Sequence, residues 1–330
     1  TRYKLVTGVQ TCALPISGTA TPGWCIGGTS ASTGSTYLLG GFNTPEGLAG
    51  FTDVDGKFYL IVGDAGNTRL QKIEAANPTN VKWVGRNSSG STACGAANGE
   101  MVMSWCSTSG IASTTASTTS YNNNGYLGSG IYGIYVDTSN SASNPSFYNV
   151  YVTSISSTTG RVMRFNATTG AFTGWIGTMG AVTTNHGCSS TPTVGLGTPS
   201  WCTGGSVSNG TGNNQFTTAV IGVYADGSNL YVTDSSGFRV TKHDLATGAF
   251  IGWKGRVQST TGLGGGTNCS TTSSGNITPT WCTGGTSKGG YTVDATNFTA
   301  ALDSPRGIVG KNGHLFIIDS GNGRLLTLPK

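Results

Sequence analysis

Charged residues are scarce in this sequence: Asp, Glu, Lys and Arg make up only 9% of its 330 residues. The 18 basic residues outnumber the 13 acidic ones, but Lys and Arg never form a run. Because nucleic-acid-binding proteins carry a basic patch or stripe, we expect no nucleic-acid partner. The sequence also lacks the stretch of about 18 apolar residues that a membrane-spanning helix requires, so no membrane span is expected.

Glycine is abundant instead, with 54 residues, and Ser, Thr and Asn fill much of the remainder. Aromatic residues reach 9%, which is enough to build a core and argues against a disordered chain. A surface with few charges and many hydroxyl and amide groups is typical of an exported β-protein. The composition therefore predicts an ordered protein outside the cytoplasm.

The two ends of the sequence do not look like natural termini. Residues 6–16 read VTGVQTCALPI and resemble the translation of an adapter used in short-read sequencing libraries. We therefore expect residues 1–17 to be an artefact and exclude them from the fold prediction. The last residues, RLLTLPK, stop partway through a repeat, so we expect the chain to be a piece of a longer protein.

A unit of about 40 residues occurs four times, at 42–86, 125–177, 216–255 and 298–330. Each copy has three short apolar runs separated by turns of Gly, Asn and Asp, and a tail typified by G-A-F-x-G-W that the last copy lacks. Such runs predict short antiparallel strands. Four strands in a 40-residue repeat are typical of a propeller blade. The predicted fold is an all-β propeller over residues 18–330 with four recognisable blades.

Three of these units carry a common motif, in YLIVGDAGNTR (59–69), LYVTDSSGFR (230–239) and LFIIDSGNGR (315–324). The motif resembles the NHL repeat. In each copy the Asp precedes the Arg by five residues: Asp64/Arg69, Asp234/Arg239 and Asp319/Arg324. In the second unit Ser154 stands at the Asp position and Arg161 follows seven residues later. The resemblance implies six blades in a closed ring, so four blades would form an open arc or a ring completed by an N-terminal strand.

The Asp/Arg pairs are predicted to be structural. Asp holds a tight turn by accepting backbone N–H groups, and Arg reaches its carboxylate in a bidentate manner. A catalytic pair would not recur in every regular blade, whereas packing residues do.

Inserts of about 40 residues, rich in Gly, Ser and Thr, separate the units, and each contains two cysteines: Cys94 and Cys106, Cys188 and Cys202, Cys269 and Cys282. A zinc site would need a C-x₂₋₄-C spacing or nearby His ligands, and a redox site would need C-x-x-C. Neither spacing occurs, so we expect three local disulfides, no metal and no cofactor. Cys25 lacks an upstream partner, because Cys12 belongs to the suspected adapter. Disulfides indicate the periplasm, the cell surface or the extracellular space.

A Trp precedes the second Cys of each pair: Trp105, Trp201 and Trp281. One interpretation is that the indole packs the stapled insert against the blade rim. The alternative is a ring of exposed Trp side chains that forms a platform for sugar or peptide ligands. Because repeat insertions often gather on the binding face, a protein or glycan partner is expected on the insert-bearing face.

Three functions remain open at this point. The preferred hypothesis is a secreted or cell-surface binding scaffold for protein or glycan, without catalysis. The second is a fragment of a metal-dependent propeller lyase or lactonase, although the inner-strand positions, which include Glu46 and Arg306, form no ligand set. The third is a structural spacer in a long surface protein.

Overall fold

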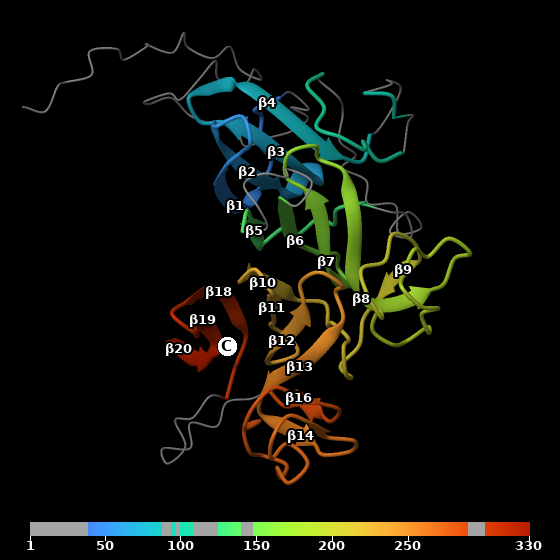
Figure 1. Cartoon of the computed structure of the whole chain (residues 1–330), viewed down its shortest axis with the longest axis vertical. Coiled ribbons are helices and arrows are strands. Elements are labelled where there is room, and N and C mark those ends of the chain that lie inside the picture. The colour runs from blue at the N-terminus through green and yellow to red at the C-terminus, as the bar shows by residue number, and fades with distance from the viewer. Residues whose placement is uncertain (1–38, 88–93, 97–99, 109–124, 140–147, 290–300) are drawn as a thin grey trace, which may run out of the picture.

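The structure is a computed structural model that describes residues 39–87, 94–96, 100–108, 125–139, 148–289 and 301–330. The adapter-like residues 6–16, Cys12 and Cys25 lie outside these ranges. The described residues form the predicted all-β propeller with four blades (Figure 1).

Blades 1 to 3 are antiparallel sheets whose four strands pair in chain order. Blade 1 comprises β1 (Pro45–Thr52), β2 (Phe58–Asp64), β3 (Arg69–Glu74) and β4 (Asn77–Gly85). Blade 2 comprises β5 (Ile134–Asp137), β6 (Asn149–Ile155), β7 (Gly160–Asn166) and β8 (Phe172–Ala181). Blade 3 comprises β10 (Val220–Ala225), β11 (Asn229–Asp234), β12 (Arg239–Asp244) and β13 (Phe250–Gly255).

Blade 4 has three strands, β18 (Pro305–Lys311), β19 (His314–Asp319) and β20 (Arg324–Pro329), as its missing G-A-F-x-G-W tail predicts. Helical structure in the described ranges is limited to two 3₁₀ turns, η1 (Ala65–Asn67) and η3 (Ser320–Asn322). None of the described segments is a helix long and apolar enough to cross a bilayer.

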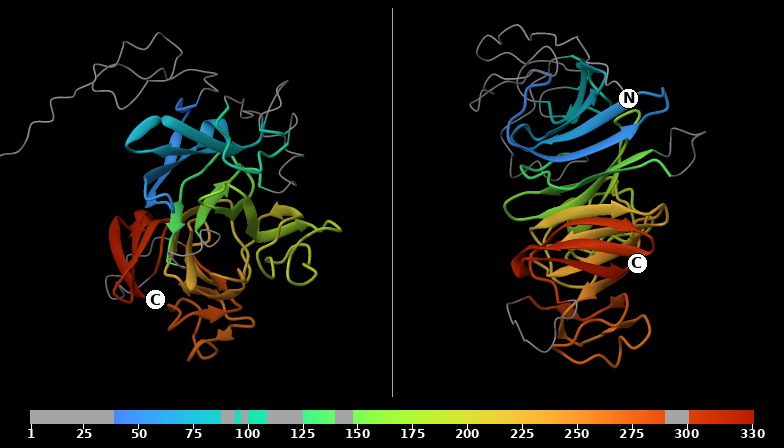
Figure 2. Two further views of the ribbon diagram at one scale, coloured as in Figure 1. Left: turned by 45° about the horizontal axis from the view of Figure 1, so that its top comes forward. Right: turned by 90° about the vertical axis from the view of Figure 1, so that its left-hand side faces the viewer.

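The blades follow one another around the inner strands, so that β1 contacts β5, β5 contacts β10 and β10 contacts β18 (Figures 1 and 2). Among the described elements, β18 shows no comparable packing on β1. The core consists of apolar layers between consecutive blades. Leu70, Val162 and Val240, at equivalent positions of blades 1 to 3, are fully buried because each faces the next blade.

The three predicted disulfides are confirmed, with Cα–Cα distances of 5.8 Å for Cys94–Cys106, 4.2 Å for Cys188–Cys202 and 5.6 Å for Cys269–Cys282. In each insert the backbone of the second Cys pairs, as an antiparallel β-bridge, with a Trp of the preceding outer strand. The pairs are Trp83–Cys106, Trp175–Cys202 and Trp253–Cys282. The inserts therefore extend the blades outward (Figure 2).

Short strands complete these inserts: β9 (Ser206–Ser208), β14 (Val257–Ser259), β15 (Gly264–Gly265), β16 (Cys282–Thr283) and β17 (Thr286–Ser287). Such loops bury little apolar area of their own. Closing a loop of about 13–15 residues contributes on the order of 3 kcal/mol in the chain-entropy model, so the staples stabilise them.

His243 of β12 is a buried basic residue at a position that is apolar in the other blades. It lies opposite Leu230, whereas the equivalent pairs are Val150 with Phe165 in blade 2 and Leu315 with Leu328 in blade 4. Its ring packs on Phe250 in the same edge-on arrangement, 5.6 Å between centroids, that Phe165 makes with Phe172. Burial lowers the pKa of His243 to about 3, so the folded protein keeps this imidazole neutral.

Acid should therefore destabilise the wild type through His243, and His243→Phe should remove that effect. The unfolded imidazole takes up a proton below its ordinary pKa of 6.5, while the folded one resists protonation down to about pH 3. Stability is thus lost as the pH falls through this window, by about 2 kcal/mol at pH 5. Urea unfolding at pH 8 and pH 5 tests this, with the exposed-site variant His314→Phe as control. If the free energy of unfolding falls equally between pH 8 and pH 5 in the wild type and in His243→Phe, the prediction is wrong.

Candidate functional site

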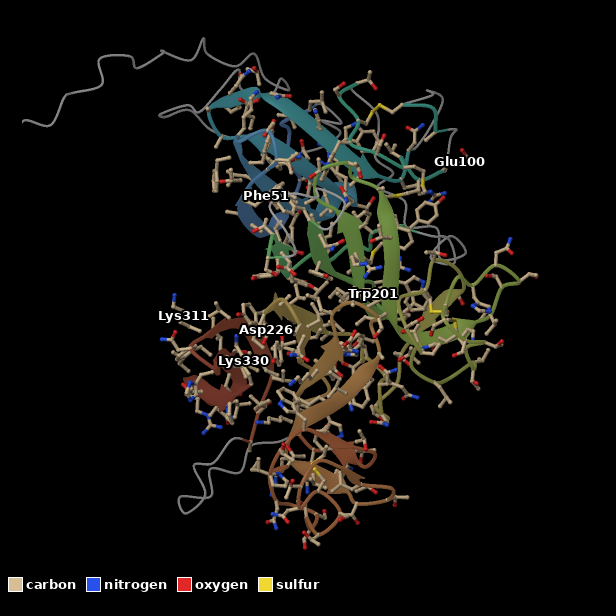
Figure 3. All side chains as sticks on the ribbon, in the orientation of Figure 1. Phe51, Glu100, Trp201, Asp226, Lys311 and Lys330 are labelled. Carbon is tan, nitrogen blue, oxygen red and sulfur yellow. A yellow bond between two sulfur atoms is a disulfide. The ribbon has the colours of Figure 1, made fainter. Side chains whose placement is uncertain are left out.

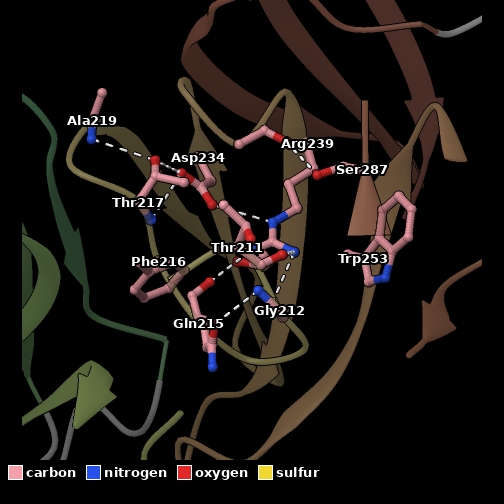
Figure 4. Close-up of polar contacts among 12 residues, drawn as sticks. Thr211, Gly212, Gln215, Phe216, Thr217, Ala219, Asp234, Arg239, Trp253 and Ser287 are labelled. Carbon is pink, nitrogen blue, oxygen red and sulfur yellow. Dashed lines mark hydrogen bonds and ion pairs between the residues drawn. The ribbon is translucent and has the colours of Figure 1, made fainter. Parts of the chain in front are cut away.

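The Asp and Arg of the repeat motif pair directly and fasten a loop to the blade. The Arg Nε–Asp Oδ2 distances are 2.7 Å for Asp64/Arg69, 3.2 Å for Asp234/Arg239 and 2.8 Å for Asp319/Arg324. In blade 3, Arg239 Nη2 also donates to Gln215 O, and Asp234 Oδ1 accepts from the N–H of Thr217 (Figure 4). The corresponding bonds join Arg69 to Gly41 and Asp64 to Asn43 in blade 1, and Arg324 to Ala301 and Asp319 to Asp303 in blade 4. Each pair thereby fixes the loop that leads into its inner strand.

Blade 2 makes the same loop contacts without a carboxylate. Ser154 lies opposite Arg161 in the register that Asp234 and Arg239 occupy in blade 3. Ser154 Oγ accepts from the N–H of Gly128, and Arg161 donates to the carbonyl of Tyr126. The longer turn of this blade therefore preserves the position of the Arg.

Each insert Trp lies between its own blade and the next one. Trp105 Nε1 donates to Ala167 O at 2.8 Å, and the Trp105 N–H donates to Thr169 O at 2.9 Å. In the same way Trp201 Nε1 donates to Leu245 O at 3.1 Å, and its N–H to Thr247 O at 2.8 Å. We call these contacts the first junction, between blades 1 and 2, and the second junction, between blades 2 and 3.

These contacts agree with the first interpretation, in which the indole packs the insert against the blade, and not with the alternative of an exposed Trp platform. The side chains of Trp201 and Trp281 are buried and Trp105 is partly buried, because the next blade covers the indole. The glycines of the contacted turns have left-handed backbones, with φ of 80° at Gly170 and 77° at Gly248. A Cβ there would lie 2.6 Å from Trp105 N or 2.7 Å from Trp201 N, so the turns require Gly.

A cation completes each of these two junctions. Lys72 Nζ lies 5.8 Å from the ring centre of Trp105, donates to Ala167 O at 3.2 Å and pairs with Asp53 at 2.5 Å. The guanidinium of Arg164 lies 4.5 Å from the ring centre of Trp201, and its Nη1 donates to Ala246 O at 3.3 Å. Burial lowers the pKa of both side chains. In both junctions, backbone carbonyls of the next blade thus accept from the Trp and from the cation.

The third junction, between blades 3 and 4, has the same donors without these acceptors. Lys242 occupies the position of Arg164, with Nζ 5.4 Å from the ring centre of Trp281 and 5.6 Å from that of Tyr231. Within the described ranges, Lys242 Nζ makes no hydrogen bond, and neither Trp281 Nε1 nor the Trp281 N–H finds an acceptor. A buried donor without a partner costs about 1–3 kcal/mol.

Further lysines make this junction electropositive. Lys254 Nζ lies 5.0 Å from the ring centre of Trp281 and donates to Pro329 O. Lys330 Nζ donates to the Tyr224 hydroxyl at 3.0 Å and lies 3.7 Å from Asp226, which also accepts from Tyr231 (Figure 3). Burial lowers the pKa of Lys242 and Lys254, and the charge of Lys242 lowers that of Lys254 further. The third junction therefore holds three ammonium groups and the carboxylate of Asp226.

Sequence reasoning missed these cations, although a signal was present. In the runs RLQK, RVMR and RVTK, a basic residue follows the motif Arg by three positions: Lys72, Arg164 and Lys242.

The inner-strand residue Glu46 has a structural contact, because its carboxylate accepts a hydrogen bond from the Ile131 N–H at 3.1 Å. Arg306 lies exposed on β18. The described residues contain no group of three or more side chains placed to bind a metal.

Comparisons with known proteins give little further information. No protein-family model matches the chain, and no curated protein does. Among solved structures, the chain is similar to the PQQ-bound form of aldose sugar dehydrogenase from Streptomyces coelicolor, with 16% identity and a TM-score of 0.33. That match covers 88% of this chain and 78% of the other. Such weak similarity supports no functional statement, and membership of the NHL family stays a prediction from the repeats.

Proposed function

We propose that this protein is a secreted or cell-surface propeller that serves as a non-catalytic binding scaffold for a protein or glycan. The observation that carries this proposal is the group of lysines at the third junction, where Lys242 and Lys254 lie beside the ring of Trp281 and Lys330 lies beside Asp226. The two equivalent junctions hold backbone carbonyls at these donors. A ligand with carbonyl, carboxylate or hydroxyl oxygens would accept hydrogen bonds from these lysines.

The surroundings favour an acceptor-rich ligand. Three lysines and one carboxylate, Asp226, lie at this junction, so the local charge is positive. The repulsion between Lys242 and Lys254 is relieved when an electron-rich group lies between them. The disulfide-closed inserts support the proposed location, because such bonds persist in oxidising compartments.

Binding to defined glycan and peptide arrays tests the scaffold function. We expect the oxidised protein to retain ligands that Lys242→Met loses by about tenfold or more, because a charge-assisted hydrogen bond contributes about 1.5–3 kcal/mol. Lys311→Met removes the same charge from an exposed site on blade 4 and serves as the control. Blank arrays for the wild type, or ligands lost equally from both variants, would contradict the proposal. Blank arrays would favour the structural spacer.

A further inference from the structure

The three disulfides of the inserts differ in their exposure to solvent. Cys94 of the first disulfide is an exposed residue, whereas its partner Cys106 is fully buried. In the third disulfide Cys269 and Cys282 are both fully buried, and in the second Cys188 is only partly exposed. Thiol–disulfide exchange requires an attacking thiolate to reach a sulfur atom. The first disulfide is therefore the most accessible of the three, and it is accessible through Cys94.

The backbone at Cys94 is also strained. Its φ is 49°, in the left-handed region that non-glycine residues rarely adopt, and Gly95 follows with a φ of 82°. None of the other five cysteines in the described ranges has a positive φ. Because the disulfide is one of the bonds that hold Cys94 in this conformation, opening it releases strain that the other two disulfides do not store in this way.

A hydroxyl group lies beside both sulfur atoms of the first disulfide. Thr108 Oγ1 is 3.6 Å from Cys94 Sγ and 3.2 Å from Cys106 Sγ. In all three inserts the residue at this position accepts a hydrogen bond from an indole of the preceding outer strand through its backbone carbonyl, which fixes its place. The equivalent residues of the second and third inserts are Gly204 and Gly284, which have no hydroxyl. A hydroxyl donor favours the thiolate form of a cysteine, so Thr108 can stabilise a leaving thiolate.

The sulfur atoms of the second disulfide have carbonyl neighbours instead. Cys188 Sγ is 3.6 Å from His186 O, and Cys202 Sγ is 3.4 Å from Ser200 O. A carbonyl oxygen donates no hydrogen bond and carries a partial negative charge, so it disfavours a thiolate beside it. The surroundings of the second disulfide therefore oppose the reaction that those of the first assist.

We infer that the Cys94–Cys106 disulfide is a thiol-exchange site through which this protein forms a mixed disulfide with an external thiol. The partner's thiolate attacks Cys94 Sγ, and a new S–S bond joins Cys94 to the partner. The bond to Cys106 breaks, and its electron pair leaves on Cys106 Sγ as a thiolate that accepts a hydrogen bond from Thr108 Oγ1. The partner thiol is oxidised to a disulfide, Cys106 is reduced, and the proton of the partner thiol goes to solvent.

The rest of the insert stays attached when this disulfide opens. Cys106 and Trp83 share two backbone hydrogen bonds, each of 2.9 Å. Trp105 keeps its bonds to Ala167 and Thr169, because none of these contacts involves a sulfur atom. The first junction therefore persists after the exchange, and the site can react without unfolding the blades.

Glutathione tests the inference on the oxidised full chain. The protein is exposed briefly to glutathione at about pH 8, quenched with acid, alkylated and mapped by peptide mass spectrometry. We expect glutathione on Cys94 and a free thiol at Cys106, formed at least about tenfold faster than any change at the other four paired cysteines. Circular dichroism of the modified protein should match that of the unmodified protein. In denaturing urea the preference should vanish, because the exposure, the left-handed φ and the Thr108 contact belong to the folded chain.

Two variants check the role of the hydroxyl. Thr108→Val should slow the exchange at Cys94 by about two- to tenfold, because it removes one hydrogen bond to the leaving thiolate. Ser107→Ala removes a hydroxyl from the exposed neighbouring residue and should leave the rate unchanged. Equal rates at the three disulfides, first attachment of glutathione at a cysteine other than Cys94, or an unchanged rate in Thr108→Val would each overturn the inference.

Discussion

Asp234→Ala should destabilise the protein by about 3–5 kcal/mol, because it leaves the guanidinium of Arg239 buried without its counter-charge. Both side chains are fully buried, and their Nε–Oδ2 distance is 3.2 Å. The substitution also removes the acceptor for Thr217, so the loop before β10 loses its attachment. Urea unfolding at neutral pH, monitored by Trp fluorescence, measures the change.

Two further variants separate charge burial from a general loss of contacts. The double variant Asp234→Ala/Arg239→Met removes both charges and should recover part of the loss, since apolar replacement of a whole buried pair is often nearly neutral. Asp226→Ala removes a carboxylate that pairs with Lys330 across 3.7 Å in a partly exposed position, and should cost about 1 kcal/mol or less. If Asp234→Ala costs no more than Asp226→Ala, the Asp/Arg pair is not what fastens the loop.

Trp201→Ala should have a comparable effect, about 3–5 kcal/mol, because a large buried ring and its Nε1 hydrogen bond to the next blade are lost. The ring packs on Tyr151 at 5.7 Å between centroids and on the guanidinium of Arg164 at 4.5 Å, and Nε1 donates to Leu245 O. Thermal unfolding followed by circular dichroism measures the loss. Trp201→Phe keeps most of the ring and should cost about 1–2 kcal/mol, largely through Nε1.

Trp281→Ala is the matched comparison, because Trp281 occupies the same position in the third junction and makes no hydrogen bond to a turn among the described residues. It should cost about 1–2 kcal/mol less than Trp201→Ala, the difference being the Nε1 hydrogen bond to the next blade, for which Trp281 has no acceptor among the described residues. Equal losses for the two substitutions would show that the junction bonds contribute nothing, and that only the apolar packing of the indole matters.

The sequence by itself determined the strands of the blades and the three disulfides of the inserts. Alternating apolar runs, turns of Gly, Asn and Asp, and a 40-residue period are local signals, because strands and hairpin turns depend on neighbouring residues. The cysteine pairs, 12, 14 and 13 residues apart, close loops within one insert, so their spacing sufficed. The three strands described for blade 4 were likewise predicted from the G-A-F-x-G-W tail that the last repeat of this sequence lacks.

Only the tertiary structure decided what the Trp residues do. Trp105 bonds to Ala167, 62 residues away, and the spacing between them gives no sign of that contact. Lys72 and Arg164 gain their role because strand pairing and blade stacking bring each of them to the indole of the following insert and to the turn of the next blade. The lack of acceptors at the third junction among the described residues is a difference between equivalent places in space. It therefore becomes visible only when the three junctions are compared atom by atom.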